Sequence, residues 1–191
     1  NYVQRTVIKA IKNDIVIVAM HTNLDAAFGG VNFKIAEKLR LRDVRFFGRE
    51  KVVTNPLTDK KVTGGDGVIG CFDTPLAADD LILLLKKEFD VECVQANELL
   101  RREIQTVALC GGSGSFLLQD AINAGADAFI TGEMGYHEFF GHEQEIQLCV
   151  IGHYQSEQYT TEVLRDVIER DCPGVKCCIS EINTNPIVYF S

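Results

Sequence analysis

Residues 149–157 are Cys149-Val150-Ile151-Gly152-His153-Tyr154-Gln155-Ser156-Glu157. The apolar first part predicts a buried strand that stops at the glycine, and the polar residues after it suit the start of a helix. Further apolar positions recur at helical spacing and continue that helix: Val163, Leu164, Val167 and Ile168. A buried strand that leads directly into a helix is typical of α/β proteins, which place their chemistry at the carboxyl ends of such strands.

His153 and Glu157 are four residues apart in this segment. If the first turn of the helix has already formed there, the two side chains lie on one face, with Cβ atoms about 5–6 Å apart. Imidazole and carboxylate groups at that separation can share a metal ion. The alternative is that both residues cap the helix or face water, and the spacing by itself leaves both interpretations open.

Length and composition bound the class of protein. The 191 residues, 46% hydrophobic and 24% charged, predict one soluble globular domain over residues 1–191, or one domain with a small lobe. The net charge of -8 and the absence of a Lys/Arg cluster argue against direct binding of nucleic acid. The seven cysteines form no CxxC pair, which favours reduced thiols and a cytoplasmic protein. No apolar run approaches the ~20 residues that span a membrane.

Strand-like and helix-like runs alternate along the chain. We expect a helix over residues 3–11, a loop or short hairpin over 48–67, and a helix over 76–89. The predicted strands are 15–20, 44–47, 68–72, 91–96, 104–110, 128–131, 148–151, 175–179 and 186–190. Three of them (15–20, 128–131 and 148–151) lack polar alternation, as expected of central strands covered on both faces. The pattern predicts a mainly parallel or mixed sheet with helices on both faces.

Three other polar segments are candidates for chemistry. His21-Thr22-Asn23-Leu24-Asp25 follows the predicted strand 15–20 and contains metal-ligand types, although Asn23 and Asp25 are also residues that shape turns. The glycine-rich residues 111–115 can present N–H groups to an anion or can form a tight turn, the interpretation that the spacing favours. His137 is a candidate acid/base group, or a side chain packed beside Phe139.

Five motifs appear in a fixed order and carry a resemblance. They are His21-Thr22-Asn23-Leu24-Asp25-Ala26-Ala27 with Gly29-Gly30-Val31-Asn32, Cys110-Gly111-Gly112-Ser113-Gly114-Ser115, Thr131-Gly132-Glu133 with Tyr136-His137, Gly152-His153-Tyr154 with Ser156-Glu157, and Asn185-Pro186. Together they resemble the dinuclear metal centre family called Nif-three-like (NGG-one-interacting-factor-three-like), also described as GTP cyclohydrolase type 2 homologues. The resemblance runs from about His21 to the carboxyl end.

The resemblance implies two divalent metal ions per subunit, with Asp25, His153 and Glu157 as ligands. The family has a further, upstream His-His pair with no counterpart here, so we expect that the family's amino-terminal segment is missing from this sequence. The resemblance also implies assembly into a ring-shaped homo-oligomer, usually a hexamer, in which the metal sites face an internal cavity. Mixed carboxylate and imidazole ligation suits Zn, Mn or Fe.

The expected function is that of a metal-dependent hydrolase acting on a small, nucleotide-like substrate. Residues 111–115 would hold the phosphate of the substrate, and His21 or His137 would move a proton. One alternative is a non-catalytic metal-binding scaffold, or a transcription-related regulator, that acts through protein partners. Another is a role in metal trafficking.

Overall fold

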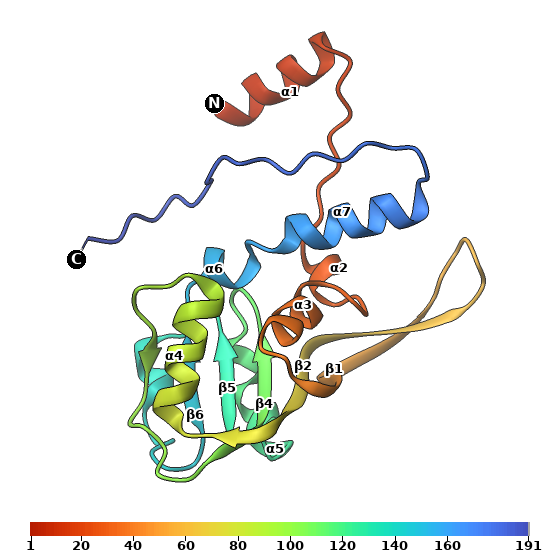
Figure 1. Ribbon diagram of the computed structural model, residues 1–191. Coiled ribbons are helices and arrows are strands. Elements are labelled where there is room, and N and C mark those ends of the chain that lie inside the picture. Colours follow the sequence, from red (N-terminus) through yellow and green to blue (C-terminus); the bar gives the residue numbers. More distant parts are fainter. Residues whose placement is uncertain (191) are drawn as a thin grey trace.

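The computed structural model describes residues 1–190 and contains a six-stranded mixed sheet with the order β1-β2-β4-β5-β6-β3 (Figure 1). The strands are β1 (Arg42–Thr54), β2 (Lys61–Leu76), β3 (Gln95–Ala96), β4 (Ile104–Cys110), β5 (Ala128–Thr131) and β6 (Gln147–Val150). The α-helices are α1 (Tyr2–Lys12), α2 (Thr22–Asp25), α3 (Val31–Lys38), α4 (Ala78–Phe89), α5 (Leu118–Asn123), α6 (His153–Glu157) and α7 (Thr160–Asp171). Two 3-10 turns, η1 (Ser115–Leu117) and η2 (Tyr136–Phe139), complete the elements.

The parallel strands β4, β5 and β6 form the centre of the molecule. The register pairs Ala108 with Phe129 and Ile130 with Cys149, so β5 has a parallel neighbour on each side. All four residues of β5 and of β6 are buried. The predicted α/β sheet and its central strands over 128–131 and 148–151 are therefore confirmed.

Helices cover both faces of the sheet. Alternate residues of β5 point to opposite sides, as a pleated strand requires. Ile130 packs with α3 and α4, whereas Phe129 packs with α5 and η1. The two apolar clusters account for the absence of polar alternation in β5, because neither face of this strand meets water.

The segment predicted as a loop or short hairpin is a hairpin whose strands are longer than expected. β1 and β2 pair antiparallel out to Thr54 and Lys61, and the distal part extends away from the rest of the sheet (Figure 1). Near the sheet, the N–H of Gly65 donates to the carbonyl of Ala26, at an N–O distance of 3.1 Å. This hydrogen bond ties the hairpin to the segment that follows α2.

Three predicted strands are wrong. Residues 15–20, 175–179 and 186–190 form neither strand nor helix, and residues 91–96 keep only the two residues of β3. Val16 is 86% exposed, where a central strand would be buried. The physical reason is that an apolar run forms a strand only when another strand lies beside it to pair its N–H and C=O groups. No such strand lies beside residues 15–20 within the part of the chain that the structure describes.

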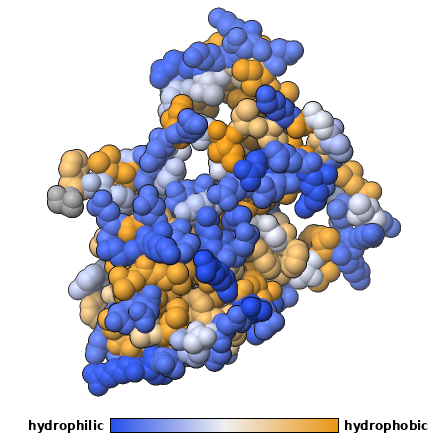
Figure 2. All heavy atoms as spheres, viewed as in Figure 1, coloured by the Kyte–Doolittle hydropathy of each residue, from blue (hydrophilic) through white to orange (hydrophobic). Residues whose placement is uncertain are grey.

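The predicted first helix is present as α1, which begins with a capping box between Asn1 and Gln4. Its large apolar side chains face solvent, as Ile11 shows with 76% of its surface exposed. Figure 2 shows apolar residues at the surface in the upper part of the molecule, where α1 and the extended terminal segments lie. No helix within residues 1–190 is long and apolar enough to cross a lipid bilayer.

Candidate metal centre

A cavity of about 280 Å³ opens at the carboxyl edge of the central strands. Its walls include four of the five side chains selected from the sequence: His21, Asp25, His153 and Glu157. His21 and Asp25 come from α2 and the residue before it, and the other two come from α6. Residues more than a hundred positions apart in the sequence therefore face one space.

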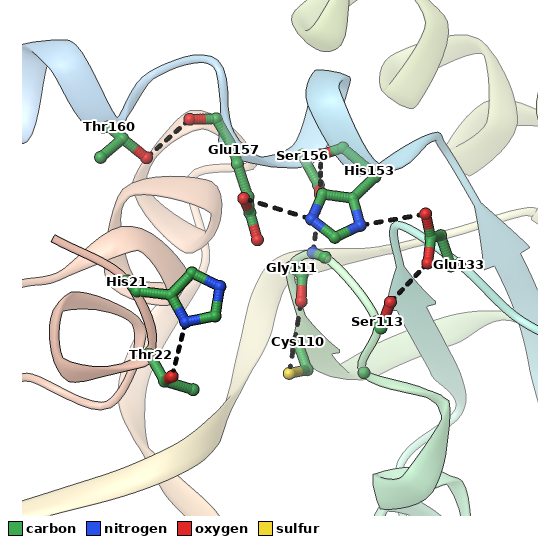
Figure 3. Close-up of polar contacts among 12 residues, drawn as sticks. His21, Thr22, Cys110, Gly111, Ser113, Glu133, His153, Ser156, Glu157 and Thr160 are labelled. Carbon is green, nitrogen blue, oxygen red and sulfur yellow. Dashed lines mark hydrogen bonds and ion pairs between the residues drawn. The ribbon is translucent and has the colours of Figure 1, made fainter. Parts of the chain in front are cut away.

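The turn from β6 into α6 sets the positions of His153 and Glu157. Gly152 has a φ of 98°, in the region that favours glycine, and its carbonyl accepts the N–H of Ser156 at 3.0 Å. The first turn of α6 is therefore wound at His153, as the four-residue spacing required. His153 Nε2 lies 3.5 Å from Glu157 Oε2 (Figure 3).

A side chain that the sequence analysis did not select completes the surroundings of His153. Glu133 Oε1 lies 3.0 Å from His153 Nδ1, and Ser113 Oγ donates to the other oxygen of Glu133 (Figure 3). The hydrogen bond from Ser113, with a further contribution from His153, lowers the pKa of Glu133. A charged carboxylate thus holds one nitrogen of the imidazole and directs the other toward Glu157.

The two carboxyl groups considered as metal ligands, those of Asp25 and Glu157, share an electrostatic environment. Burial raises the pKa of Asp25, although the nearby imidazoles of His21 and His153 act in the opposite direction. Burial also raises the pKa of Glu157; His153 opposes this, and the negative charge of Asp25 adds to it. Half-buried acids that disfavour each other's charge are stabilised in the ionised form by a cation placed between them.

The glycine-rich turn supports the cavity but does not present its amides to it. The N–H of Gly111 donates to Asn32 Oδ1 (2.8 Å), that of Gly112 to Ser156 Oγ (2.9 Å), and that of Gly114 to Thr131 Oγ1 (3.0 Å). Three of the donors that an anion would need are already used by the protein. The structure supports the tight-turn interpretation and does not support a phosphate cradle at residues 111–115.

Gly112 also allows the turn to approach α6 closely. Its φ is 60°, and a Cβ atom at this position would overlap Glu157 Oε1 and lie 3.3 Å from His153 Nε2. Glycine is required here on both counts, because other residues rarely adopt this φ and any side chain would displace the two candidate ligands.

The buried side chain of Asn32 fixes the second half of the cavity. Its amide nitrogen donates to the carbonyls of Asp25 (3.2 Å) and Asp66 (3.1 Å), while its oxygen accepts from Gly111. Only 1% of Asn32 is exposed. One carboxamide thus joins the backbone of a candidate ligand, the hairpin and the glycine-rich turn.

The two histidines considered for proton transfer lie in different surroundings. His21 lines the cavity, and its Nδ1 lies 2.9 Å from Thr22 Oγ1, so Nε2 is the nitrogen left to exchange a proton (Figure 3). His137 is not among the residues that line the cavity. Its ring is exposed, stacks on Phe140 with centroids 6.4 Å apart and meets Tyr136 edge-on, so its aromatic neighbours differ from the Phe139 considered for it.

The donor set fits a divalent metal ion in its chemistry, because Asp25, His153 and Glu157 supply oxygen and nitrogen ligands of the types that Zn, Mn and Fe accept. The side chains are not gathered to ligation distance, since residues 1–190 contain no group of three His, Cys, Asp or Glu close enough to hold an ion. His153 is instead held between Glu133 and Glu157. Metal binding therefore stays a prediction, and it requires these side chains to move closer together.

Comparison with known sequences and structures gives consistent matches. The chain matches the family described as Duf34/NIF3 (NGG1p interacting factor 3) over residues 1–186. A protein of Clostridium perfringens named GTP cyclohydrolase 1 type 2 homolog is 29% identical over 97% of this chain and 69% of its own length. A protein of Streptococcus pneumoniae with the same name is 31% identical over 68% of this chain, a match that covers only 46% of that relative.

Solved structures show the same fold. A hypothetical protein of Staphylococcus aureus superposes with a TM-score of 0.82 over 96% of this chain and 72% of its own, at 24% identity. A Bacillus cereus protein related to NIF3 gives a TM-score of 0.74 over 97% of this chain and 76% of its own, at 20% identity.

Proposed function

The chain belongs to the Duf34/NIF3 family, and we propose that it binds divalent metal ions at the carboxyl edge of its sheet and hydrolyses a small nucleotide-like substrate there. One observation carries this proposal: Asp25, His153 and Glu157 line the same cavity although they are distant in sequence. Strand-end cavities in α/β proteins are the usual location of bound ligands.

The roles of the residues follow from their positions. The carboxylates of Asp25 and Glu157 and the Nε2 atom of His153 would hold the ions. Bound there, a divalent ion supplies a Lewis acid and activates water for attack. Glu133 keeps His153 in place through Nδ1, and His21 Nε2 is positioned to accept or return a proton at the edge of the cavity.

Two features favour an enzyme over a scaffold with structural metals. The candidate ligands line a cavity of about 280 Å³ that leaves room for a substrate, whereas a structural zinc site is closed by four protein ligands. The name carried by the similar proteins of Clostridium perfringens and Streptococcus pneumoniae, GTP cyclohydrolase 1 type 2 homolog, supports a nucleotide-like substrate. Assembly into a hexameric ring is a further proposal that rests on the family resemblance. A cytoplasmic location is another, which rests on the seven cysteines without a CxxC pair.

The test is the substitution Glu157→Gln in full-length protein, with Glu169→Gln on the exposed part of α7 as a matched control. Glu157→Gln keeps the size of the side chain and removes the charge that would hold the metal. We expect nucleotide turnover to fall at least about 100-fold while the melting temperature is largely kept. The control should leave both unchanged. Loss of thermal stability, with no turnover detectable in either the wild type or the variant, would favour the scaffold and reject the enzyme.

A further inference from the structure

We propose that a second cavity, between the β1–β2 hairpin and residues 22–28, binds the phosphate of an organic phosphate that also carries a flat apolar group. Arg49 and Lys51 are the anion-binding residues of this subsite. The inference rests on the proposed function, because it assigns the part of the substrate that lies beside the metal centre.

The position of the cavity is the first argument. Its volume is about 640 Å³, within the range of ~300–1,000 Å³ that is typical of small-molecule sites. Thr22, Ala26 and Asp66 line both this cavity and the candidate metal centre. A ligand bound under the hairpin therefore extends directly toward Asp25.

The charge of the cavity is the second argument. Arg49 and Lys51 are two residues apart on β1, so they share a face, and both line the cavity. Glu50, between them, lines a different cavity. Neither cation takes part in an ion pair within residues 1–190. Two unpaired cations on one wall, in a chain with a net charge of -8, are suited to an anion.

The strand paired with these cations approaches the α2–α3 connection closely. Lys51 pairs across the hairpin with Gly64, which has no side chain. A Cβ atom on Gly64 would lie 2.7 Å from the carbonyl of Ala26, so the hairpin closes against the α2–α3 connection at this glycine. The cavity is thus bounded by backbone on one side and by the two cations on the other.

The apolar part of the wall indicates what the phosphate is attached to. Phe28, Val53 and Val62 line the same cavity and are 78%, 56% and 44% exposed. Exposed aromatic and branched side chains next to a few charged groups are typical of sites for organic ligands, and a phenylalanine ring offers a stacking surface. The glycine-rich turn is a poorer phosphate site, since the amides of Gly111, Gly112 and Gly114 already donate to the protein.

The experiment measures binding rather than turnover, by calorimetric titration of full-length protein with guanosine 5′-monophosphate, guanosine and inorganic phosphate. Titrations are run in EDTA and after metal loading, so that the subsite is tested even if the protein binds no metal. The variants are Arg49→Ala with Lys51→Ala, and the matched control Lys60→Ala with Lys61→Ala at the exposed tip of the same hairpin. Phe28→Ala tests the apolar wall.

We expect the double substitution of Arg49 and Lys51 to lower the affinity for the nucleotide about ten-fold or more. The substitutions at the hairpin tip should leave this affinity unchanged. Phe28→Ala should lower the affinity for the nucleotide but not the affinity for inorganic phosphate. The proposal is overturned if the wild type binds no nucleotide under either condition, if the cavity and tip variants weaken it equally, or if guanosine binds as tightly as its phosphate. A failure of metal loading or of turnover, with the nucleotide result intact, would instead reject the proposed hydrolase.

Discussion

Residues 128–131 and residues 15–20 are both apolar runs without polar alternation, yet the first is buried and the second is exposed. Ile130, in the first run, is 1% exposed, whereas Val16, in the second, is 86% exposed. The first run is strand β5, with β4 and β6 on its two sides and helices above and below. The second has no strand beside it within the described chain. Composition indicates that a segment is able to enter a sheet, and neighbouring strands decide whether it does.

The largest expected effect tests this difference with one side-chain type. Ile130→Ala removes a side chain from the packed core and should lower the free energy of unfolding by about 2–5 kcal/mol. Ile17→Ala removes the same atoms from a side chain that is 57% exposed and should change it by no more than about 0.5 kcal/mol. Denaturant unfolding of both variants gives the two values. Equal losses would mean that residues 15–20 are packed in solution, and the comparison would fail.

A smaller effect on stability is expected from the hydrogen-bonded carboxylate that precedes β5. Asp127, just before β5, accepts the N–H groups of Gln105 (3.0 Å) and Thr106 (2.8 Å) at the start of β4. Burial alone would raise its pKa, but these bonds and the guanidinium of Arg102 lower it. Asp127→Ala should cost about 1–3 kcal/mol at neutral pH, and Glu103→Ala, on an exposed side chain, almost nothing.

The pH dependence of that loss follows from the sign of the shift. A carboxyl group whose pKa is lowered by folding stabilises the protein above its ordinary value of 3.8, and the stabilisation disappears as the pH falls through the lowered pKa. The difference between wild type and Asp127→Ala should therefore shrink below about pH 4. A difference that stays constant down to pH 2 would show that packing, rather than charge, accounts for the role of Asp127.

The smallest effect concerns the carboxyl end of the same strand. Glu133, two residues after β5, holds His153 Nδ1, so Glu133→Ala should lower the affinity for divalent metal about ten-fold while the metal-free protein keeps its melting temperature. Competition with a chelating dye measures the affinity, with Glu143→Ala as the exposed control. Unchanged affinity would mean that Glu133 does not position the imidazole.

Sequence reasoning found the parts of the fold that depend on local pattern. The strands over 104–110, 128–131 and 148–151 and the helical turn at His153 all follow from apolar runs and spacing. It failed for 15–20, 175–179 and 186–190, because pairing with a distant strand leaves no mark on the apolar run itself. The segment 48–67, predicted as an exposed loop or short hairpin, is a hairpin with longer strands than expected.

The candidate metal ligands could be selected from the sequence, but the residues that hold them in position were not. His153 and Glu157 carry a spacing signal, and Asp25 carries a motif. Glu133 could have been selected from the sequence, since it lies at the carboxyl end of a predicted strand. The same criterion selected His153. Asn32 belongs to the first motif, but no role could be assigned to it, because a buried asparagine in a helix resembles any polar residue on an exposed face. Its role appears only when three segments are seen around one side chain.

The side chain of Asn32 connects the two cavities. Asn32 holds the backbone of Asp25 with one hydrogen of its amide and the backbone of Asp66 with the other. Asp66 lines both cavities, so a ligand that shifts the hairpin also shifts the anchor of a candidate metal ligand. If both proposed sites bind their ligands, the two binding equilibria would be linked, and linkage is reciprocal. Metal binding would then change the affinity for the anion by the same factor as anion binding changes the affinity for the metal.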